Sequence, residues 1–477
     1  MSSNNRPEAF DWQLYPQAEK LLLQRLDEFL AASRVARNLS ARMTSESSTR
    51  LFDWIDHIVL PNTLIEPETL LELGFVENHN IERIEGTRVF EHNMSILFPV
   101  LVSKDESTQI ALKPEDLDRF LQMNGRYYAW PGDTPGDAEM SRVHDNVEGT
   151  PYSPYRRALV NKEGSHQVWA VERRGWNGYA VQDDWASAQH SDYELVLRKF
   201  LTRRRHFSSD RSGLEATLEL VRLGCDEMAE ERVADAFFRA ERQFWMSRER
   251  GGQVQWAGQS RLGLGWGNHD HHTFRSSREN FHLLIQIFET MGFEPREQFF
   301  AGQKAGWGAQ VLEHPVCHIT IFADVDISVD ERNRDFAHEP MEPSDNLGTI
   351  GLWVALHGES ILQAGMHHLA ARVDFSRARA GLERYGIRSL YPFSDFKFLK
   401  QAFVESERRP VESERLELIS EKGLIDQERR NDFGDKGAIG SHIEIIQRGQ
   451  GFKGFNQDSV SVIISATDPR KHTERNA

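Results

Sequence analysis

Three residues in the second half of the chain have the types and spacing of a metal-ligand set: His271, His368 and Glu444. Each histidine opens a segment that is expected to form a strand, and Glu444 lies inside a third such segment, GSHIEIIQRGQGF. Two neutral imidazoles and one carboxylate on one face of an ion are the ligand set of non-haem Fe(II) oxygenases. The other coordination positions stay open, so that a bidentate substrate and O2 can bind the same ion.

Glu444 is the most informative member of this set because its neighbours Ile443, Ile445 and Ile446 are apolar. A carboxylate in such a strand is costly to bury unless it meets a cation. The alternative is an edge strand on which Glu444 faces solvent.

The register of both histidines is open by one residue, because His269, His272 and His367 stand beside them. Successive side chains of a strand point to opposite faces, so only one of each neighbouring pair can face the metal. His318, on a further predicted strand, is either a supporting residue of the site or an ordinary core histidine.

The elements that must position these residues form two units of the same order: a strand that opens on histidine, a helix that ends at a glycine turn, and further strands. In the first unit a strand over 270–275 precedes an amphipathic helix that ends at Met291, and the unit closes with the strand 316–327. The second unit opens at 365–375 and closes at 440–452. This repeated order indicates an internal duplication.

The first half of the chain carries a weaker form of the same pattern. A strand over 51–63 contains Asp-His and is followed by a helix over 66–74 and strands over 88–102. This order matches the opening of a βαβββ module and makes His57 a candidate for a second metal site. The alternative is a capped structural histidine.

Between the halves, the sequence predicts a hairpin over 168–185 and a long helical bridge over 214–249 that ends at Gly251-Gly252. The expected class is α+β, with tandem βαβββ modules, added helices and an N-terminal α+β half. We expect two domains, an N-terminal domain over residues 1–210 (a degenerate module is one interpretation) and a metal-binding domain over 211–477.

Composition narrows the class of protein. A chain of 477 residues with 39% hydrophobic residues is long enough for two or three cores. Its net charge of −16 argues against nucleic acid or an anionic membrane as the main partner, although a local basic pocket can still bind a small anion. The two cysteines, Cys225 and Cys317, cannot form a disulfide framework, and the sequence shows no signal peptide or apolar run of membrane-spanning length. We expect a cytoplasmic protein.

The segments around the ligand candidates resemble one family. His271 with the helix after it, HHLAARVDF, SDFKFLKQAF and IEIIQRG are similar to the 2-oxoadipate dioxygenase/decarboxylase family. More distantly they resemble 4-hydroxyphenylpyruvate dioxygenase, in which strands of the form DHIV, QHIA and IEIIQR carry the iron ligands. Both families have the vicinal oxygen chelate fold, in which paired modules form a half-open barrel. The resemblance covers about half of the chain, from roughly residue 210 onward.

The resemblance implies that His271, His368 and Glu444 bind Fe(II). Arg275 matches the arginine that follows the first ligand in the oxoadipate family and binds a substrate carboxylate, which makes it the implied catalytic and substrate-binding residue. On a strand, positions 271 and 275 point to the same face. The implied reaction is oxidative decarboxylation of a small anionic 2-oxo acid by O2, with hydroxylation of the same molecule.

Two other functions fit the same residues. The same fold and ligands can hold Mn, Zn or Ni for an isomerase, lyase or hydrolase reaction without O2. A non-catalytic module that binds a small ligand between paired modules is the second alternative. The sequence determines neither the substrate nor the oligomeric state, for which a homodimer is one option.

Overall fold

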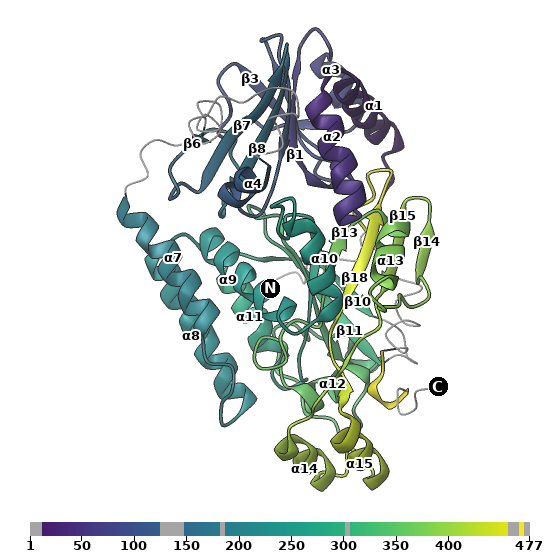
Figure 1. Ribbon diagram of the computed structural model, residues 1–477. Helices are drawn as coiled ribbons and strands as arrows, with labels where there is room; N and C mark the ends of the chain where they lie inside the picture. Colours follow the sequence, from purple (N-terminus) through teal and green to yellow (C-terminus); the bar gives the residue numbers. More distant parts are fainter. Residues whose placement is uncertain (1–11, 125–146, 182–186, 301–305, 457–466, 472–477) are drawn as a thin grey trace.

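The computed structural model describes residues 12–124, 147–181, 187–300, 306–456 and 467–471. In this part of the chain the strands form two eight-stranded sheets and one two-stranded ribbon, β16 (Arg408–Arg409) with β17 (Ala438–Ile439). One sheet comes from each half of the chain, and the first lies above the second in Figure 1. The predicted α+β class is confirmed.

The first sheet has the strand order β2-β3-β4-β1-β5-β8-β7-β6. β1 is parallel to β4 and β5 is parallel to β8, whereas the other neighbouring strands are antiparallel. In chain order a strand, a helix and three strands occur twice, with helices α3 (Pro67–Glu72) and α4 (Leu117–Asn124). The strands are β1 (Ile55–Pro61), β2 (Val76–Glu77), β3 (Thr87–Glu91), β4 (Val100–Ser103), β5 (Thr108–Leu112), β6 (Val147–Glu148), β7 (Tyr155–Glu163) and β8 (His166–Arg173).

The second sheet repeats this arrangement, with the order β10-β11-β12-β9-β13-β18-β15-β14 and parallel pairs β9–β12 and β13–β18. Its module helices are α11 (Phe281–Thr290) and α13 (Phe375–Glu383). The tandem βαβββ units predicted for this half are therefore confirmed, and each of their strands has a counterpart in the first sheet. The strands are β9 (His269–Arg275), β10 (Glu294–Phe300), β11 (Trp307–Glu313), β12 (Thr320–Asp326), β13 (His368–Arg372), β14 (Ser394–Phe396), β15 (Leu399–Phe403) and β18 (His442–Arg448).

The two faces of the second sheet differ in chemistry. One face carries apolar residues such as Phe274, Leu369 and Ile443, which join the largest hydrophobic core together with residues of helices α8 (Asp210–Glu227), α9 (Glu230–Met246) and α11. Because side chains alternate along a strand, the opposite face, called the inner face below, receives His271 and Thr273. The core thus holds the strands whose inner face carries the candidate ligands.

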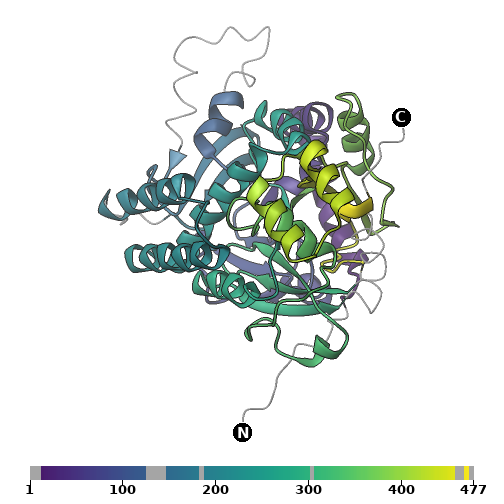
Figure 2. The ribbon, with the colours of Figure 1, turned by 90° about the horizontal axis from the view of Figure 1, so that it is seen from below.

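The remaining helices surround these sheets (Figure 1). From below, Figure 2 shows α14 and α15 in yellow-green lying across the near side of the molecule. No helix of the described ranges is long and apolar enough to cross a membrane. The other helices are α1 (Pro16–Ala32), α2 (Arg34–Arg42), α7 (Ser187–Thr202), α10 (Arg250–Ser260), α12 (Thr349–His357), α14 (Ser413–Glu421) and α15 (Gln427–Lys436), with the short turns η1 (Met43–Ser47), η2 (Leu51–Trp54), η3 (Asp330–Asn333) and η4 (Pro469–Lys471).

Two local predictions are wrong. β8 pairs with the preceding strand β7 around a turn at Gly164, and residues 174–181 form no strand, so the hairpin predicted over 168–185 is not found in its described part. Its last residues, 182–185, lie outside the described ranges. Gly251 and Gly252 lie in the first turn of α10 and do not end a bridge, because Glu249 caps their amides. The boundary proposed between residues 210 and 211 falls at the start of α8 and stays a prediction.

Candidate metal centre

The three candidate ligands lie on adjacent strands at the centre of the second sheet. Ala370 of β13 lies opposite His271 of β9 on one side and opposite Glu444 of β18 on the other. His368 precedes Ala370 by two residues and shares its face of the sheet. Since the alanine side chain is small, the larger side chains on both flanks can converge above it.

A β-bulge at the start of β9 determines which residues point inward. His269 and His271 lie opposite the adjacent residues Ala371 and Ala370, so Asp270 is the extra residue of the bulge. Oδ1 of Asp270 lies 3.0 Å from Nδ1 of His271. Such a contact fixes the tautomer of the imidazole and leaves Nε2 free for a metal ion.

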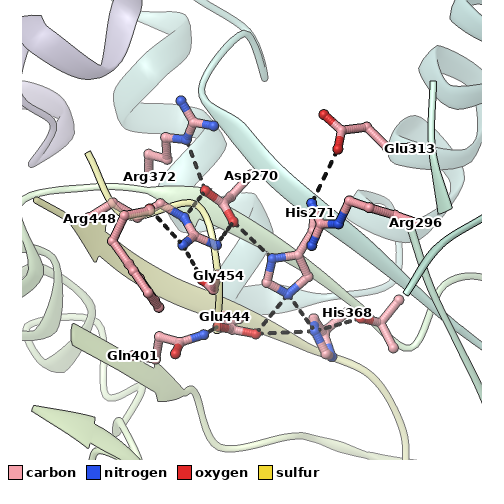
Figure 3. Close-up of polar contacts among 12 residues, drawn as sticks. Asp270, His271, Arg296, Glu313, His368, Arg372, Gln401, Glu444, Arg448 and Gly454 are labelled. Atoms are coloured by element: carbon pink, nitrogen blue, oxygen red, sulfur yellow. Dashed lines mark hydrogen bonds and ion pairs between the residues drawn. The ribbon is translucent and has the colours of Figure 1, made fainter. Parts of the chain in front are cut away.

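The ligand atoms of the candidate set point toward one another (Figure 3). Oε2 of Glu444 lies 3.3 Å from Nε2 of His271 and 3.2 Å from Nε2 of His368, and the two nitrogens are 3.5 Å apart. Metal–ligand bonds of about 2.1 Å place neighbouring donor atoms about 3 Å apart. The nitrogen and oxygen donors present therefore fit a divalent ion of the first transition row without rearrangement.

The charge states of these three residues also favour binding of a cation. Burial opposes ionisation, but the charge of His271 and hydrogen bonds from both imidazoles hold the pKa of Glu444 well below its usual range. Burial likewise opposes protonation of His271, yet Glu444 and Asp270 raise its pKa to about 9. Burial lowers the pKa of His368 to about 4, against the influence of Glu444. Without an ion, a proton on His271 thus compensates the carboxylate, and a metal would replace that proton.

Residues around the ligands hold them in place. Asp270 accepts from Arg448 at 2.7 and 2.9 Å and from Nε of Arg372 at 2.9 Å. Gln401 of β15 donates from Nε2 to Oε1 of Glu444 at 2.8 Å. These contacts leave Oε2 of Glu444 facing the two imidazoles.

The histidines next to the candidate ligands lie elsewhere in the fold. His272 points to the outer face, where its ring centroid lies 4.9 Å from that of Phe238 and burial keeps its pKa well below the usual value. His318 was predicted on a strand but lies before β12, which begins at Thr320. It lines a cavity between the two halves.

His367 and His442 form a second imidazole group with His368 in the described chain. Nδ1 of His367 lies 3.2 Å from Nδ1 of His368, and the ring of His442 stacks on that of His368 at 5.3 Å. This group contains no carboxylate and shares His368 with the first. It therefore competes with the set that contains Glu444 and cannot hold a separate ion.

Arg275 lies on the same inner face, four residues after His271, and is completely buried. Its guanidinium faces Trp353 at 5.5 Å and donates from Nη2 to Thr467 at 3.4 Å, while Nε lies 4.0 Å from Asp324. Nε and Nη1 make no hydrogen bond with the described residues. Burial lowers the pKa of Arg275 to about 10 and raises that of Asp324 to about 7. A buried guanidinium with two unused donors can bind an anionic group.

His57 occupies the position in β1 that His271 occupies in β9. It lies opposite Ala111 across an equivalent bulge, and Asp56 lies 2.6 Å from its Nδ1. By the same register, Gln109 and Trp169 take the places of His368 and Glu444. Among the described residues no group of three His, Cys, Asp or Glu forms around His57.

The sequence alone did not indicate several of the supporting residues. Asp270 is the residue before a candidate ligand and could have been suspected from the Asp-His pair that recurs at Asp56. Gln401 and Thr273 gave no signal, since their role depends on strands that meet only in the fold. Oγ1 of Thr273 lies 2.8 Å from Nε2 of His368.

The chain is similar to several solved structures at low sequence identity. No protein-family profile and no curated protein sequence matches the chain. Among solved structures, it is similar to a mutant of 4-hydroxymandelate synthase from Streptomyces coelicolor, with 11% identity over 89% of this chain and 99% of that chain at a TM-score of 0.28. A xylose isomerase-like TIM barrel/4-hydroxyphenylpyruvate dioxygenase fusion protein matches with 11% identity over 96% of this chain and 57% of that chain, at a TM-score of 0.23. The Mn(II)-bound glyoxalase from Novosphingobium aromaticivorans matches with 8% identity over 84% of this chain and 83% of that chain, at a TM-score of 0.19.

Proposed function

We propose that the protein is an Fe(II)-dependent dioxygenase that acts on a 2-oxo acid by oxidative decarboxylation, with hydroxylation of the same substrate. The observation that carries this proposal is the convergence of His271, His368 and Glu444 on one buried point of the inner face. A ligand set on one face of an ion leaves positions for a bidentate substrate and O2.

His271, His368 and Glu444 would hold the iron. Bound iron would supply the redox chemistry and the open positions at which substrate and O2 meet. The chain contributes the geometry: Asp270 orients His271, and Gln401 orients Glu444. Phe322, with its ring centroid 4.8 Å from that of His271, gives the site an apolar wall on this side.

Arg275 would bind an anionic group of the substrate at a distance from the metal. On an extended strand, four residues span about 13 Å between Cα atoms, and the arginine side chain shortens the gap on the inner face. A substrate whose 2-oxo acid end reaches the ligand set can therefore place a second carboxylate on Arg275. A 2-oxo dicarboxylic acid is therefore the favoured substrate.

The test is substrate-dependent O2 uptake with CO2 release by protein reconstituted anaerobically with Fe(II). We expect turnover of 2-oxo acids that carry a second carboxylate, and none by His368→Ala. Arg275→Met should raise KM for these dicarboxylic acids but have little effect on 2-oxo monocarboxylic acids. Arg278→Met serves as the control, because Arg278 lies beyond the end of β9 and its partly buried guanidinium is already paired with Glu331.

Other results would lead to other functions. Bound Mn, Zn or Ni with turnover that needs no O2 would indicate an isomerase, lyase or hydrolase on the same ligands. Ligand binding that is unaffected by alanine at all three metal positions would indicate a non-catalytic binding protein.

A further inference from the structure

A cavity of about 550 Å³ lies between the two halves of the molecule. Its walls include Lys113 and Arg173 from the first half and His269, His318 and Arg372 from the second. Its volume is in the range that accommodates small-molecule ligands. Among the three candidate metal ligands, His271 alone lines this cavity.

The cavity walls reflect the duplication of the fold. Asp56 binds Arg173 at 2.7 and 2.8 Å on one side, just as Asp270 binds Arg448 on the other. Both pairs line the cavity. Arg173 is the last residue of β8, and Arg448 is the last residue of β18. These two strands hold the same position in their sheets, so equivalent strand ends of the two halves face the same cavity.

Lys113 and Arg372 also occupy equivalent positions. Lys113 lies two residues after Ala111, which is opposite His57, and Arg372 lies two residues after Ala370, which is opposite His271. Arg372 binds Asp270, but Lys113 makes no ion pair or hydrogen bond through its ammonium with the described residues. Burial and the nearby charge of Arg372 lower the pKa of Lys113 to about 8. An ammonium in this position lacks the partner that its counterpart has.

Lys113 has no carboxylate partner of its own at the strand ends that line the cavity. Asp56 pairs with Arg173, and Asp270 pairs with both Arg448 and Arg372. Asp53, Glu91 and Glu294 also line the wall, but Asp53 pairs with Arg50 and none of the three forms an ion pair with Lys113 among the described residues. The other basic residues of the cavity are compensated locally. These pairs are Arg242–Glu115, Arg239–Asp235, and Lys453 and Arg296 with Glu313.

His318 adds a neutral donor to the same space. It has a backbone φ of 53°, a left-handed conformation that is uncommon for residues other than glycine. His318 lines the cavity, and desolvation by the surrounding protein lowers the pKa of its imidazole to about 4. A strained residue of this kind is often found at a binding site.

We propose that the cavity between the halves is a binding site for a small dianion, either a phosphate-like ion or a dicarboxylate, held by Lys113 and Arg372 with His318 as a further donor. The site lies outside the metal-ligand set and does not depend on the proposed oxygenase activity. Charge-assisted contacts to two cationic side chains in a cavity partly shielded from solvent provide the affinity.

The experiment is calorimetric titration of the full chain with inorganic phosphate, sulfate and succinate, in buffers free of other anions of this kind. We expect saturable binding of at least one of them at one site per chain, and the phosphate and succinate arms separate the two ligand classes. Lys113→Met should weaken this binding about tenfold or more, which corresponds to the loss of one buried charge contact. Lys113→Arg should retain it, and Lys104→Met, at an exposed lysine, should have no effect.

A measurement on the unaltered protein makes the test independent of folding of the variants. The bound anion should protect Lys113, but not Lys104, from acetylation detected by mass spectrometry. Glu444→Gln, which alters the metal site, should bind the anion as the wild type does. The proposal fails if no anion binds, if Lys113→Met binds equally well, or if Glu444→Gln abolishes binding.

Discussion

At the scale of single residues, the central feature is a carboxylate oxygen placed between two imidazole nitrogens. Glu444 is 2% exposed and lies in a strand of isoleucines, so its charge must be compensated inside the protein. His271 compensates it with a proton, and His368 contributes a hydrogen bond. A divalent ion at this point would compensate the carboxylate more completely and needs the same three side chains.

Gln401 offers a direct prediction at this scale. Gln401→Leu removes the hydrogen bond to Oε1 of Glu444 and keeps the volume of the side chain similar. Because supporting contacts orient metal ligands, we expect the affinity for the metal to fall about ten- to a hundredfold. Metal titration against a competing chelator measures the change.

Gln298→Leu is the matched control, since Gln298 bonds to Gln310 on β10 and β11 and does not touch the ligands. Equal affinity of the Gln401 variant and the wild type would contradict the assigned role of this contact.

The sequence predicted His271 and His368 as the ligands but left their register open by one residue, toward His272 and His367. The choice depends on the bulge at Asp270 and on the pairing of Ala370 with both flanking strands. These features arise from contacts between residues 99 and 74 positions apart in the chain (His271 with Ala370, and Ala370 with Glu444), so the alternation along a single strand could not reveal them.

At the scale of secondary structure elements, the start of α10 carries an unusual cap. Glu249 accepts from the amides of Gly251, at 3.1 Å, and Gly252. Burial raises its pKa to about 7 in spite of these hydrogen bonds. The sequence pattern predicted a helix end at the two glycines, because it gave no sign that a buried carboxyl would start a new helix there.

This cap predicts a pH dependence of stability. Between pH 4.5 and about 7 the unfolded chain has lost the Glu249 proton and the folded chain has kept it, so the free energy of unfolding decreases as pH rises. Each unit of pKa difference is worth about 1.4 kcal/mol, which gives a total of roughly 3 kcal/mol. Glu249→Gln keeps an acceptor oxygen and cannot ionise, so it should be stabilised relative to wild type at pH 8 and much less at pH 5.

Urea denaturation at both pH values measures this difference. Glu417→Gln, at an exposed position of α14, is the control and should show no such pH dependence. A Glu249 variant whose stability relative to wild type is the same at pH 5 and pH 8 would show that this carboxyl is not the titrating group.

At the scale of the whole molecule, the chain contains the same eight-strand arrangement twice. The second copy carries the full candidate ligand set, whereas the first has Asp56, His57 and Arg173, with Gln109 and Trp169 at the other two positions. The sequence predicted only the opening of one module in the first half. The later strands gave no such signal, because they carry Gln109 and Trp169, and no candidate metal ligand, at the equivalent positions.

Metal binding should stabilise the whole chain. An ion that binds only the folded state adds about 2.7 kcal/mol when its free concentration is a hundred times Kd. We expect Fe(II) or Mn(II) to raise Tm by a few degrees and a chelator to reverse the change. His368→Ala should show no metal-dependent shift, whereas His79→Ala, at an exposed position, should behave as the wild type does. An equal shift in both variants would place the stabilising ion elsewhere.

The most direct test of the central claim is elemental analysis of protein purified anaerobically and reconstituted with Fe(II). We expect about one iron per chain, held by a single set of two imidazoles and one carboxylate. The iron should be lost in His271→Ala and Glu444→Ala and retained in His442→Ala. Protein that binds no metal after reconstitution, or that keeps its iron in Glu444→Ala and loses it in His442→Ala, would contradict the assignment.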